Sequence, residues 1–166
     1  MSLAQALVAE FDSEAASTRK VLARLPESKF AFRPHAKSME AGALASHLAT
    51  ILFWGATVLK EREFDVAPGG ELRPSIHHKS SAALLAAFDK NAAEFRAALA
   101  GASEDDLQVK WALKKNGQVV FEMPRAAVLR PMIFHHTVHH RAQLCVYLRL
   151  LDVPVPSIYG PTADEA

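Results

Sequence analysis

Four stretches of the chain carry apolar residues at helical spacing, and segments containing proline or glycine separate them. These stretches cover about residues 2–25, 38–62, 80–100 and 132–151. Recurrence at intervals of three and four residues places the apolar side chains along one side of a helix, which must be buried against other elements. The pattern predicts an all-α four-helix bundle. At 166 residues the chain has the size of a single domain spanning 1–166.

Several residues mark the expected helix ends. Pro26 ends the first helix, and Ser38 is the expected N-cap of the second. Ser80 or Ser81 can cap the third helix, and Gly101 occupies the position of a C′ glycine after it. These signals divide the chain into helices separated by short and long connections.

Two of the connections between the helices contain residues that predict their structure. The long segment 63–78 contains two prolines and two glycines, as expected of a crossover connection between helices that are not neighbours. Between Leu107 and Met123, apolar and polar residues alternate on both sides of Asn116-Gly117, the strongest short-range signal for a hairpin. We therefore expect a small β-hairpin before the last helix.

The last helical region contains a proline at an unfavourable position. Pro124 can occupy a first turn, whereas Pro131 lacks the N–H needed for a helical hydrogen bond and would clash with the carbonyl of Ala127. We expect a kink or break at Pro131, followed by a continuous helix from Met132 to Leu151.

Composition excludes several classes of function. The chain is 50% hydrophobic and 22% charged with a net charge of +1, which argues against disorder and against a polybasic surface for nucleic acid. The single cysteine, Cys145, cannot form an internal disulfide, and residues 1–25 carry charges where a signal peptide would be apolar. We expect no apolar run to approach the roughly 20 residues of a membrane span, because His, Arg or Lys interrupts the most hydrophobic stretches. We expect a cytoplasmic protein that contacts neither membrane nor nucleic acid.

The most unusual local feature is a cluster of histidines. Four of the eight histidines lie in the six residues 135–140, inside the last predicted helix. Helical residues four apart project from the same side, so His136 and His140 can address one point, as can His135 and His139. A helical His-x-x-x-His motif supplies two imidazole nitrogens for zinc, nickel, copper or iron. Either pair still requires a third ligand.

A helical wheel separates the two pairs. At 100° per residue, His140 lies about 40° from the direction of His136. Gln143 and Tyr147 lie about 20° to either side of His136. His135 and His139 point instead toward a flank of the helix. The first pair therefore shares its face with an amide and a phenol that can assist a site.

The second predicted helix supplies a third histidine. His47 lies within its apolar stripe, close to the directions of Ile51 and Trp54. Burying imidazoles without partners costs about 1–3 kcal/mol for each unsatisfied group, and a shared metal would satisfy three lone pairs together. His47 is therefore the natural third ligand.

The other histidines and the cysteine are weaker candidates for functional residues. His77 and His78 lie in a proline-containing loop, where a solvated pair or a capping contact is the ordinary interpretation, and His35 is expected to be exposed. Cys145 faces away from His136 on the wheel, which favours burial over catalysis. The sequence contains neither a Gly-x-Ser-x-Gly turn nor a phosphate-binding glycine loop, so a triad hydrolase is not supported.

Several short motifs, in order along nearly the whole chain, resemble the DinB/YfiT-like family. They are Leu25-Pro26-Glu27 with Phe32-Arg33-Pro34, Leu44-Ala45-Ser46-His47-Leu48, His136-x-x-x-His140-Arg141-Ala142-Gln143-Leu144, and the ending Tyr147-Leu148-Arg149, Val153-Pro154-x-Pro156 and Tyr159-Gly160. Ala142 stands where many members carry glycine, a change between small residues.

The resemblance implies a four-helix bundle whose three histidines bind a divalent metal, usually zinc or nickel. Carried onto this chain, the ligands are His47, His136 and His140, and alignment through Arg141 favours this pair over His135 and His139. The family belongs with mycothiol-, bacillithiol- and glutathione-dependent enzymes, and it implies a homodimer.

We therefore expect a metal-dependent enzyme acting on a small molecule, either a hydrolase or a transferase that uses a low-molecular-weight thiol. Candidates for orienting the ligands or the substrate are His139, Gln143, Tyr147 and Trp54. No Asp or Glu lies beside the ligands on the last helix, which weakens the hydrolase alternative. The rival hypothesis is a metal-binding stress-response bundle without catalytic activity.

Overall fold

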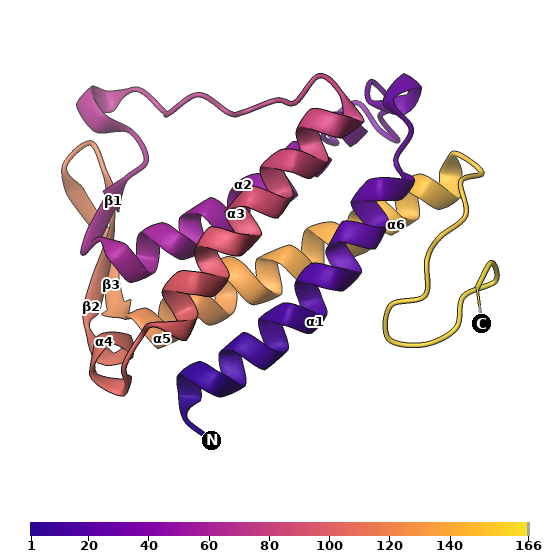
Figure 1. Ribbon diagram of the computed structural model, residues 1–166. Coiled ribbons are helices and arrows are strands. Elements are labelled where there is room, and N and C mark those ends of the chain that lie inside the picture. The colour runs from indigo at the N-terminus through magenta and orange to yellow at the C-terminus, as the bar shows by residue number, and fades with distance from the viewer. Residues whose placement is uncertain (166) are drawn as a thin grey trace.

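Four long helices lie side by side in a computed structural model that describes residues 1–165 (Figure 1). They are α1 (Leu3–Arg24), α2 (Ala41–Lys60), α3 (Ser81–Ala100) and α6 (His136–Leu150). A small three-stranded sheet lies at one end of these helices, together with the short helix α4 (Glu104–Gln108). The predicted four-helix bundle is confirmed.

The ends of α1 and α3 follow the sequence signals. The Ser2 hydroxyl accepts a hydrogen bond from the Gln5 N–H and the Gln5 side chain accepts one from the Ser2 N–H, forming a capping box at the start of α1. Ser80 caps α3 by accepting from the Ala83 N–H. α3 ends just before Gly101 as predicted, but Gly101 is the C-cap and not C′, and its φ of −87° is right-handed.

The start of α2 differs from the prediction. The N-cap is Glu40 and not Ser38, and no side chain caps this end. Instead, the N–H groups of Ala41 and Gly42 donate to the carbonyls of Phe32 and Phe30 at 2.8 and 2.9 Å. The preceding loop, which includes the 3₁₀ turn η1 (Glu27–Lys29), thus satisfies the helix end with backbone carbonyls.

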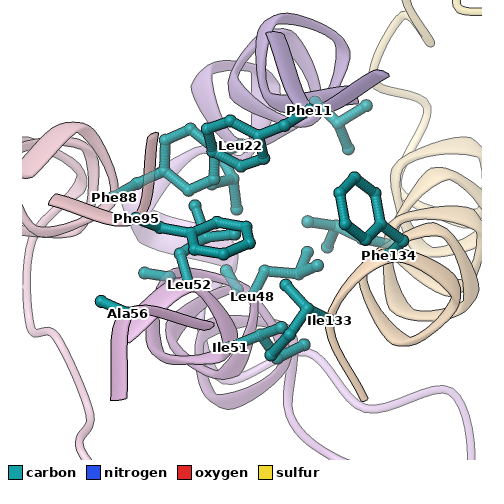
Figure 2. Packing of buried hydrophobic residues seen from close by; sticks show 14 of the residues in the cluster. Phe11, Leu22, Leu48, Ile51, Leu52, Ala56, Phe88, Phe95, Ile133 and Phe134 are labelled. Atoms are coloured by element: carbon teal, nitrogen blue, oxygen red, sulfur yellow. The ribbon is translucent and has the colours of Figure 1, made fainter. Parts of the chain in front are cut away.

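Aromatic and aliphatic side chains from α1, α2, α3 and the turn just before α6 meet in the core (Figure 2). Leu144 and Leu148 of α6 belong to the same buried cluster. Phe95 of α3 packs edge-to-face on Phe11 of α1, with ring centroids 4.8 Å apart. The ring centroids of Phe95 and Phe134 are 6.3 Å apart. Gly55 of α2 lets the Phe95 ring approach, since a Cβ at Gly55 would lie 2.8 Å from that ring. Each fully buried side chain of this size contributes about 1.5–3 kcal/mol.

The predicted hairpin forms between β2 (Lys110–Lys115) and β3 (Gln118–Pro124), which pair antiparallel. Asn116 and Gly117 have φ values of 51° and 75°, as the tight turn of a twisted hairpin requires. The sequence did not predict β1 (Glu63–Asp65), which pairs parallel to β2 and makes the sheet three-stranded.

Asp65 connects β1 to the hairpin turn. Its carboxylate accepts hydrogen bonds from the N–H groups of Gly117 and Asn116 at 2.7 and 3.1 Å. The bond from Gly117 is the main reason that the pKa of Asp65 lies below its ordinary value. After the 3₁₀ turn η2 (Pro68–Gly70), the long connection runs from the sheet to the opposite end of the bundle before α3 begins (Figure 1). It joins neighbouring helices and not the non-neighbouring pair expected, since Asn91 of α3 donates to the Ala49 carbonyl of α2 at 2.9 Å.

Pro131 widens the helix without breaking it. The chain stays helical through α5 (Arg125–Leu129), the π-helical segment η3 (Arg130–His135) and α6. A π turn holds one more residue than an α turn, which accommodates a proline that would otherwise clash with the carbonyl four residues earlier. Of the expected kink or break at Pro131, the break does not occur, and the irregularity takes the form of the π segment. α-Helical geometry begins at His136 and not at Met132.

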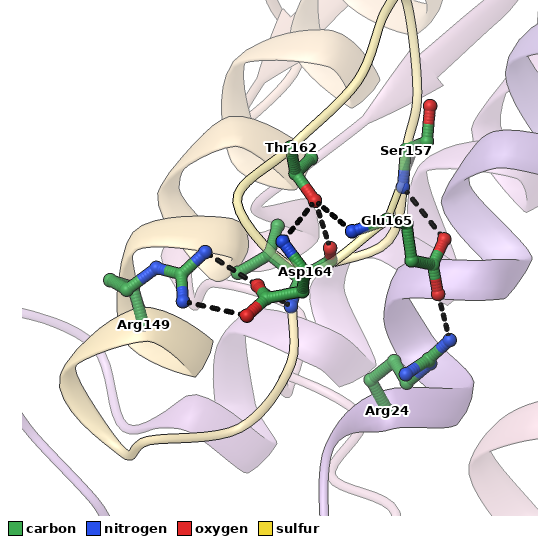
Figure 3. Close-up of polar contacts among 7 residues, drawn as sticks. Arg24, Arg149, Ser157, Thr162, Asp164 and Glu165 are labelled. Atoms are coloured by element: carbon green, nitrogen blue, oxygen red, sulfur yellow. Dashed lines mark hydrogen bonds and ion pairs between the residues drawn. The ribbon is translucent and has the colours of Figure 1, made fainter.

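The segment after α6 is held against the bundle by charged residues (Figure 3). Arg149 of α6 pairs with Asp164, which also accepts from the Val155 N–H at 2.8 Å. Arg24 at the end of α1 pairs with Glu165. The ending of the chain therefore links the C-terminal ends of α1 and α6.

α2 contradicts the expectation that no apolar run approaches the length of a membrane span. α2 is long and apolar enough to span a membrane, with a mean hydropathy of 1.5. However, 67% of that apolar stretch is buried inside the fold. A central helix of a bundle has this composition because it is covered by neighbours on several sides.

Candidate metal centre

Three histidines converge between α2 and α6. His47 projects from α2, and His136 and His140 project from successive turns of α6. One ring nitrogen from each lies within 4.8 Å of the others, and all three side chains are half-buried. The ring centroids are separated by 4.6 to 5.0 Å. The structure thus brings together the three residues that the sequence indicated.

The spacing of the nitrogens fits a metal ligand set. The Nε2 atoms of His47 and His136 lie 3.3 Å apart. Two nitrogens bound to a tetrahedral zinc, each at about 2.0–2.1 Å, would be about 3.3–3.4 Å apart. No Asp, Glu or Cys among residues 1–165 belongs to the group, so its donors are three imidazoles.

Hydrogen bonds on the far side of the rings orient two of the ligands. His140 Nδ1 lies 2.7 Å from Gln143 Oε1, and His136 Nδ1 lies 3.3 Å from the carbonyl oxygen of Met132. When each Nδ1–H donates to its oxygen, the lone pair of the ring is on Nε2, which faces the other histidines. Gln143 and Met132 therefore prepare both rings of α6 for a metal.

The contact at Met132 lies where the π segment ends and α6 begins. The backbone N–H of His136 donates to the carbonyl of Ile133, three residues earlier, and not to that of Met132. The Met132 carbonyl is consequently within reach of the His136 side chain. Sequence reasoning missed this contact because the acceptor is a backbone group whose position depends on the helix geometry.

Burial keeps the three imidazoles neutral. It lowers the pKa of His47 to about 4, with smaller contributions from the neighbouring His140 and His136. Burial is also the main cause of the lowered pKa values of His136 and His140. Neutral imidazoles offer lone pairs at pH 7, and because they carry no charge they leave the full charge of a bound cation in place.

The other proposed site residues lie at different distances from the three histidines. Trp54 packs edge-to-face against the ring of His47, with centroids 6.1 Å apart. His139 is exposed, with its ring 4.9 Å from that of His140. Tyr147 is buried, and its hydroxyl donates to the carbonyl of Met39 at 3.2 Å. Of these three residues, Trp54 and His139 border the ligands directly.

The remaining histidines and the cysteine lie apart from the group. His135 and His77 are exposed, and the backbone N–H of His78 donates to the Ser46 hydroxyl at 3.0 Å. Cys145 is half-buried, and burial raises the pKa of its thiol. A thiol with a raised pKa is a poor nucleophile at pH 7.

Arg141 has a role that its motif alone did not reveal. Its guanidinium is buried, lies 2.7 Å from the Glu14 carboxylate and donates to the Thr18 hydroxyl at 3.2 Å. Tyr159 of the terminal segment joins the same group of contacts. Arg141 therefore fixes α6 against α1 immediately beside His140, and a charged residue within an apolar helix was the signal for such a contact.

Comparisons with known proteins agree with this architecture. The model of the DinB family matches residues 1–166. A DinB-like protein from Bacillus subtilis has a TM-score of 0.70 at 20% identity, with 93% of this chain and 98% of that chain covered. A DinB-like protein from Bacillus cereus has a TM-score of 0.66 at 22% identity, covering 89% and 92%. These identities establish a common fold only, and no curated protein matches the chain.

Proposed function

The chain belongs to the DinB family, and on this premise we propose that it is a metal-dependent transferase for a low-molecular-weight thiol. The observation that carries the proposal is the convergence of His47, His136 and His140. Zinc or nickel is the proposed metal, because neutral imidazoles suit both. When bound, such a cation acts as a Lewis acid that stabilises a thiolate or acidifies a water molecule.

The chain's own residues support the site in three ways. Gln143 and the Met132 carbonyl hold the Nδ1 protons of the two α6 ligands. Trp54 packs edge-to-face against the His47 ring. Arg141 fixes the helix that carries both ligands. Each contact reduces the movement of the ligands before substrate arrives.

The donor set favours the transferase over the hydrolase. In the proposed reaction a thiolate sulfur attacks an electrophilic carbon and forms a C–S bond, the leaving group departs with its electron pair, and the thiol proton passes to solvent. This reaction requires no general base on the protein once the thiolate is formed. A hydrolase also has to protonate its leaving group, and among residues 1–165 no carboxylate belongs to the group of ligands.

Elemental analysis of untagged protein, purified without chelators, tests the metal centre. We expect one equivalent of zinc or nickel per chain, and its loss in His47→Ala and His136→Ala. His139→Ala is the matched control, because His139 is an exposed neighbour that we place outside the ligand set. Loss of metal in the control but not in His136→Ala would assign the ligands to the other histidine pair.

Turnover separates the transferase from its rivals. Metal-loaded protein is assayed with glutathione, mycothiol or bacillithiol and a chlorodinitrobenzene electrophile, and separately with nitrophenyl esters. Metal-dependent thiol conjugation supports the proposal, and ester cleavage alone supports the hydrolase. Metal binding without turnover in either panel would support the stress-response bundle without catalytic activity. The homodimer and the cytoplasmic location stay predictions, and light scattering tests the first.

A further inference from the structure

A closed-in apolar cavity of about 180 Å³ lies between α2, the sheet and the π turn. Three aromatic side chains, Trp54, Phe64 and Trp111, form part of its wall. The rest of the wall consists of Thr57, Val66, Leu113 and Met132. No polar atom of the described residues contributes to its open surface. Such a surface suits a hydrocarbon group and not a charged one.

The cavity and the metal centre have two residues in common. Trp54 lines the cavity and also packs edge-to-face on His47. Met132 lines the cavity with its side chain, while its carbonyl oxygen lies 3.3 Å from His136 Nδ1. The cavity therefore lies next to the metal centre.

Trp111 carries an unused hydrogen-bond donor behind this wall. The residue is 2% exposed, and its Nε1 has no acceptor among residues 1–165. A buried donor without an acceptor is unfavourable and uncommon in folded proteins. Because no polar atom of the described residues contributes to the surface of the cavity, this N–H lies behind the wall that an occupant would touch, and the wall itself stays apolar.

We propose that this cavity binds the apolar part of the electrophilic substrate, an aryl ring or a branched alkyl group of similar size. The inference rests on the proposed function and adds the substrate class to it. An apolar cavity of about 150 Å³ in another protein stays dry and binds benzene, so the present volume accommodates one ring. The electrophilic carbon, one or two bonds from the ring, then lies toward His47 and the thiolate.

Fluorescence offers a direct assay of the cavity without metal. The chain contains two tryptophans, Trp54 and Trp111, and both line the cavity. Iodobenzene is the probe, because its heavy atom quenches an indole that it touches. We expect saturable quenching of metal-free protein, reversed by excess benzene. Val66→Phe fills the cavity and should weaken binding at least about tenfold.

The control adds the same ring elsewhere. Val120 on β3 is 58% exposed and does not line the cavity, so Val120→Phe should leave the quenching unchanged. Circular dichroism and zinc content establish that both variants fold. If Val66→Phe fails to fold, Leu113→Phe replaces it, because Leu113 lies on the same wall.

Turnover by the zinc-loaded protein connects the cavity to the reaction. With glutathione as the thiol, benzyl chloride should exceed allyl chloride in kcat/KM on the order of 30-fold, the effect of burying a phenyl ring. Val66→Phe should lower the kcat/KM for benzyl chloride toward that for allyl chloride, whereas Val120→Phe should keep the preference for benzyl chloride.

The outcomes are distinguishable. Two results would overturn the inference and leave the proposed function standing, provided that the protein binds zinc and turns over allyl chloride. One is the absence of quenching by iodobenzene, and the other is quenching without a preference for benzyl chloride. Absence of zinc binding, or of turnover with every electrophile, would overturn the proposed function and the inference that rests on it. Cavity-dependent quenching together with the lost preference in Val66→Phe supports both.

Discussion

Replacing Gln143 by leucine should weaken zinc binding about tenfold without unfolding the protein. The Gln143 side chain is exposed, and its Oε1 lies 2.7 Å from Nδ1 of His140. When His140 binds a cation, its Nδ1–H becomes a stronger donor, so this hydrogen bond becomes charge-assisted and is worth about 1.5–3 kcal/mol. Leucine has a similar size and no acceptor.

Exposure sets the expected magnitude at the lower end of that range. Water can approach Nδ1 in the variant and replace part of the lost hydrogen bond, which leaves a deficit of about 1.4 kcal/mol, or tenfold in the dissociation constant. Ligand-orienting contacts of this kind typically change metal affinity 10- to 100-fold, in the range of about 1.4–2.7 kcal/mol. The same loss should reduce the stabilisation that a fixed excess of zinc gives against unfolding.

Competition with a chromophoric chelator measures the dissociation constant, and urea titration with and without zinc measures the stabilisation. Gln143→Glu retains an acceptor at the same position and should bind zinc at least as tightly as the native chain. Gln118→Leu, the same substitution at an exposed position of β3, is the matched control. Equal zinc affinities for Gln143→Leu, Gln118→Leu and the native chain would refute the role assigned to Gln143.

Three further predictions concern the metal-free protein and use urea unfolding midpoints. Burial lowers the pKa of His47 from 6.5 to about 4, so between these pH values the unfolded chain binds a proton that the folded chain does not. The free energy of unfolding should therefore fall as the pH decreases from about 6.5 to 4, and an unchanged urea midpoint would contradict this. Arg141→Met leaves the Glu14 carboxylate without its buried partner and should cost about 3 kcal/mol, whereas a loss below about 1 kcal/mol would mean that the pair contributes little. Gly55→Ala introduces a Cβ only 2.8 Å from the Phe95 ring and should cost about 1–3 kcal/mol, and a neutral result would show that the ring can move away.

The sequence predicted those parts of the fold that depend on local patterns. Asn116-Gly117 specified the hairpin because few residues adopt positive φ at two successive positions. β1 was not predictable in this way, since three residues carry no periodicity and their pairing with β2 depends on contacts such as that of Asp65 with the turn. Ser38 looked like a cap, but the carbonyls of Phe30 and Phe32 had already satisfied the start of α2.

In the candidate site, too, local spacing was predictable from the sequence and contacts between distant residues were not. Helical spacing was sufficient to place His136 and His140 together, and the apolar stripe of α2 placed His47 opposite them. A wheel gives direction around a helix but says little of what lies opposite each turn along its axis. Tyr147 shares the direction of His140, yet it lies two turns further along α6, where its hydroxyl meets the carbonyl of Met39.

The π turn also determines how this chain should be aligned with its relatives. One extra residue in a helical turn rotates everything after it by about 100° relative to an uninterrupted α-helix. A relative that lacks the π turn can keep its histidine pair facing α2 only if it has one residue fewer between the hairpin and the pair. A single-residue gap in 130–135 is therefore a compensated change, whereas the same gap within 136–140 would separate the ligands from each other.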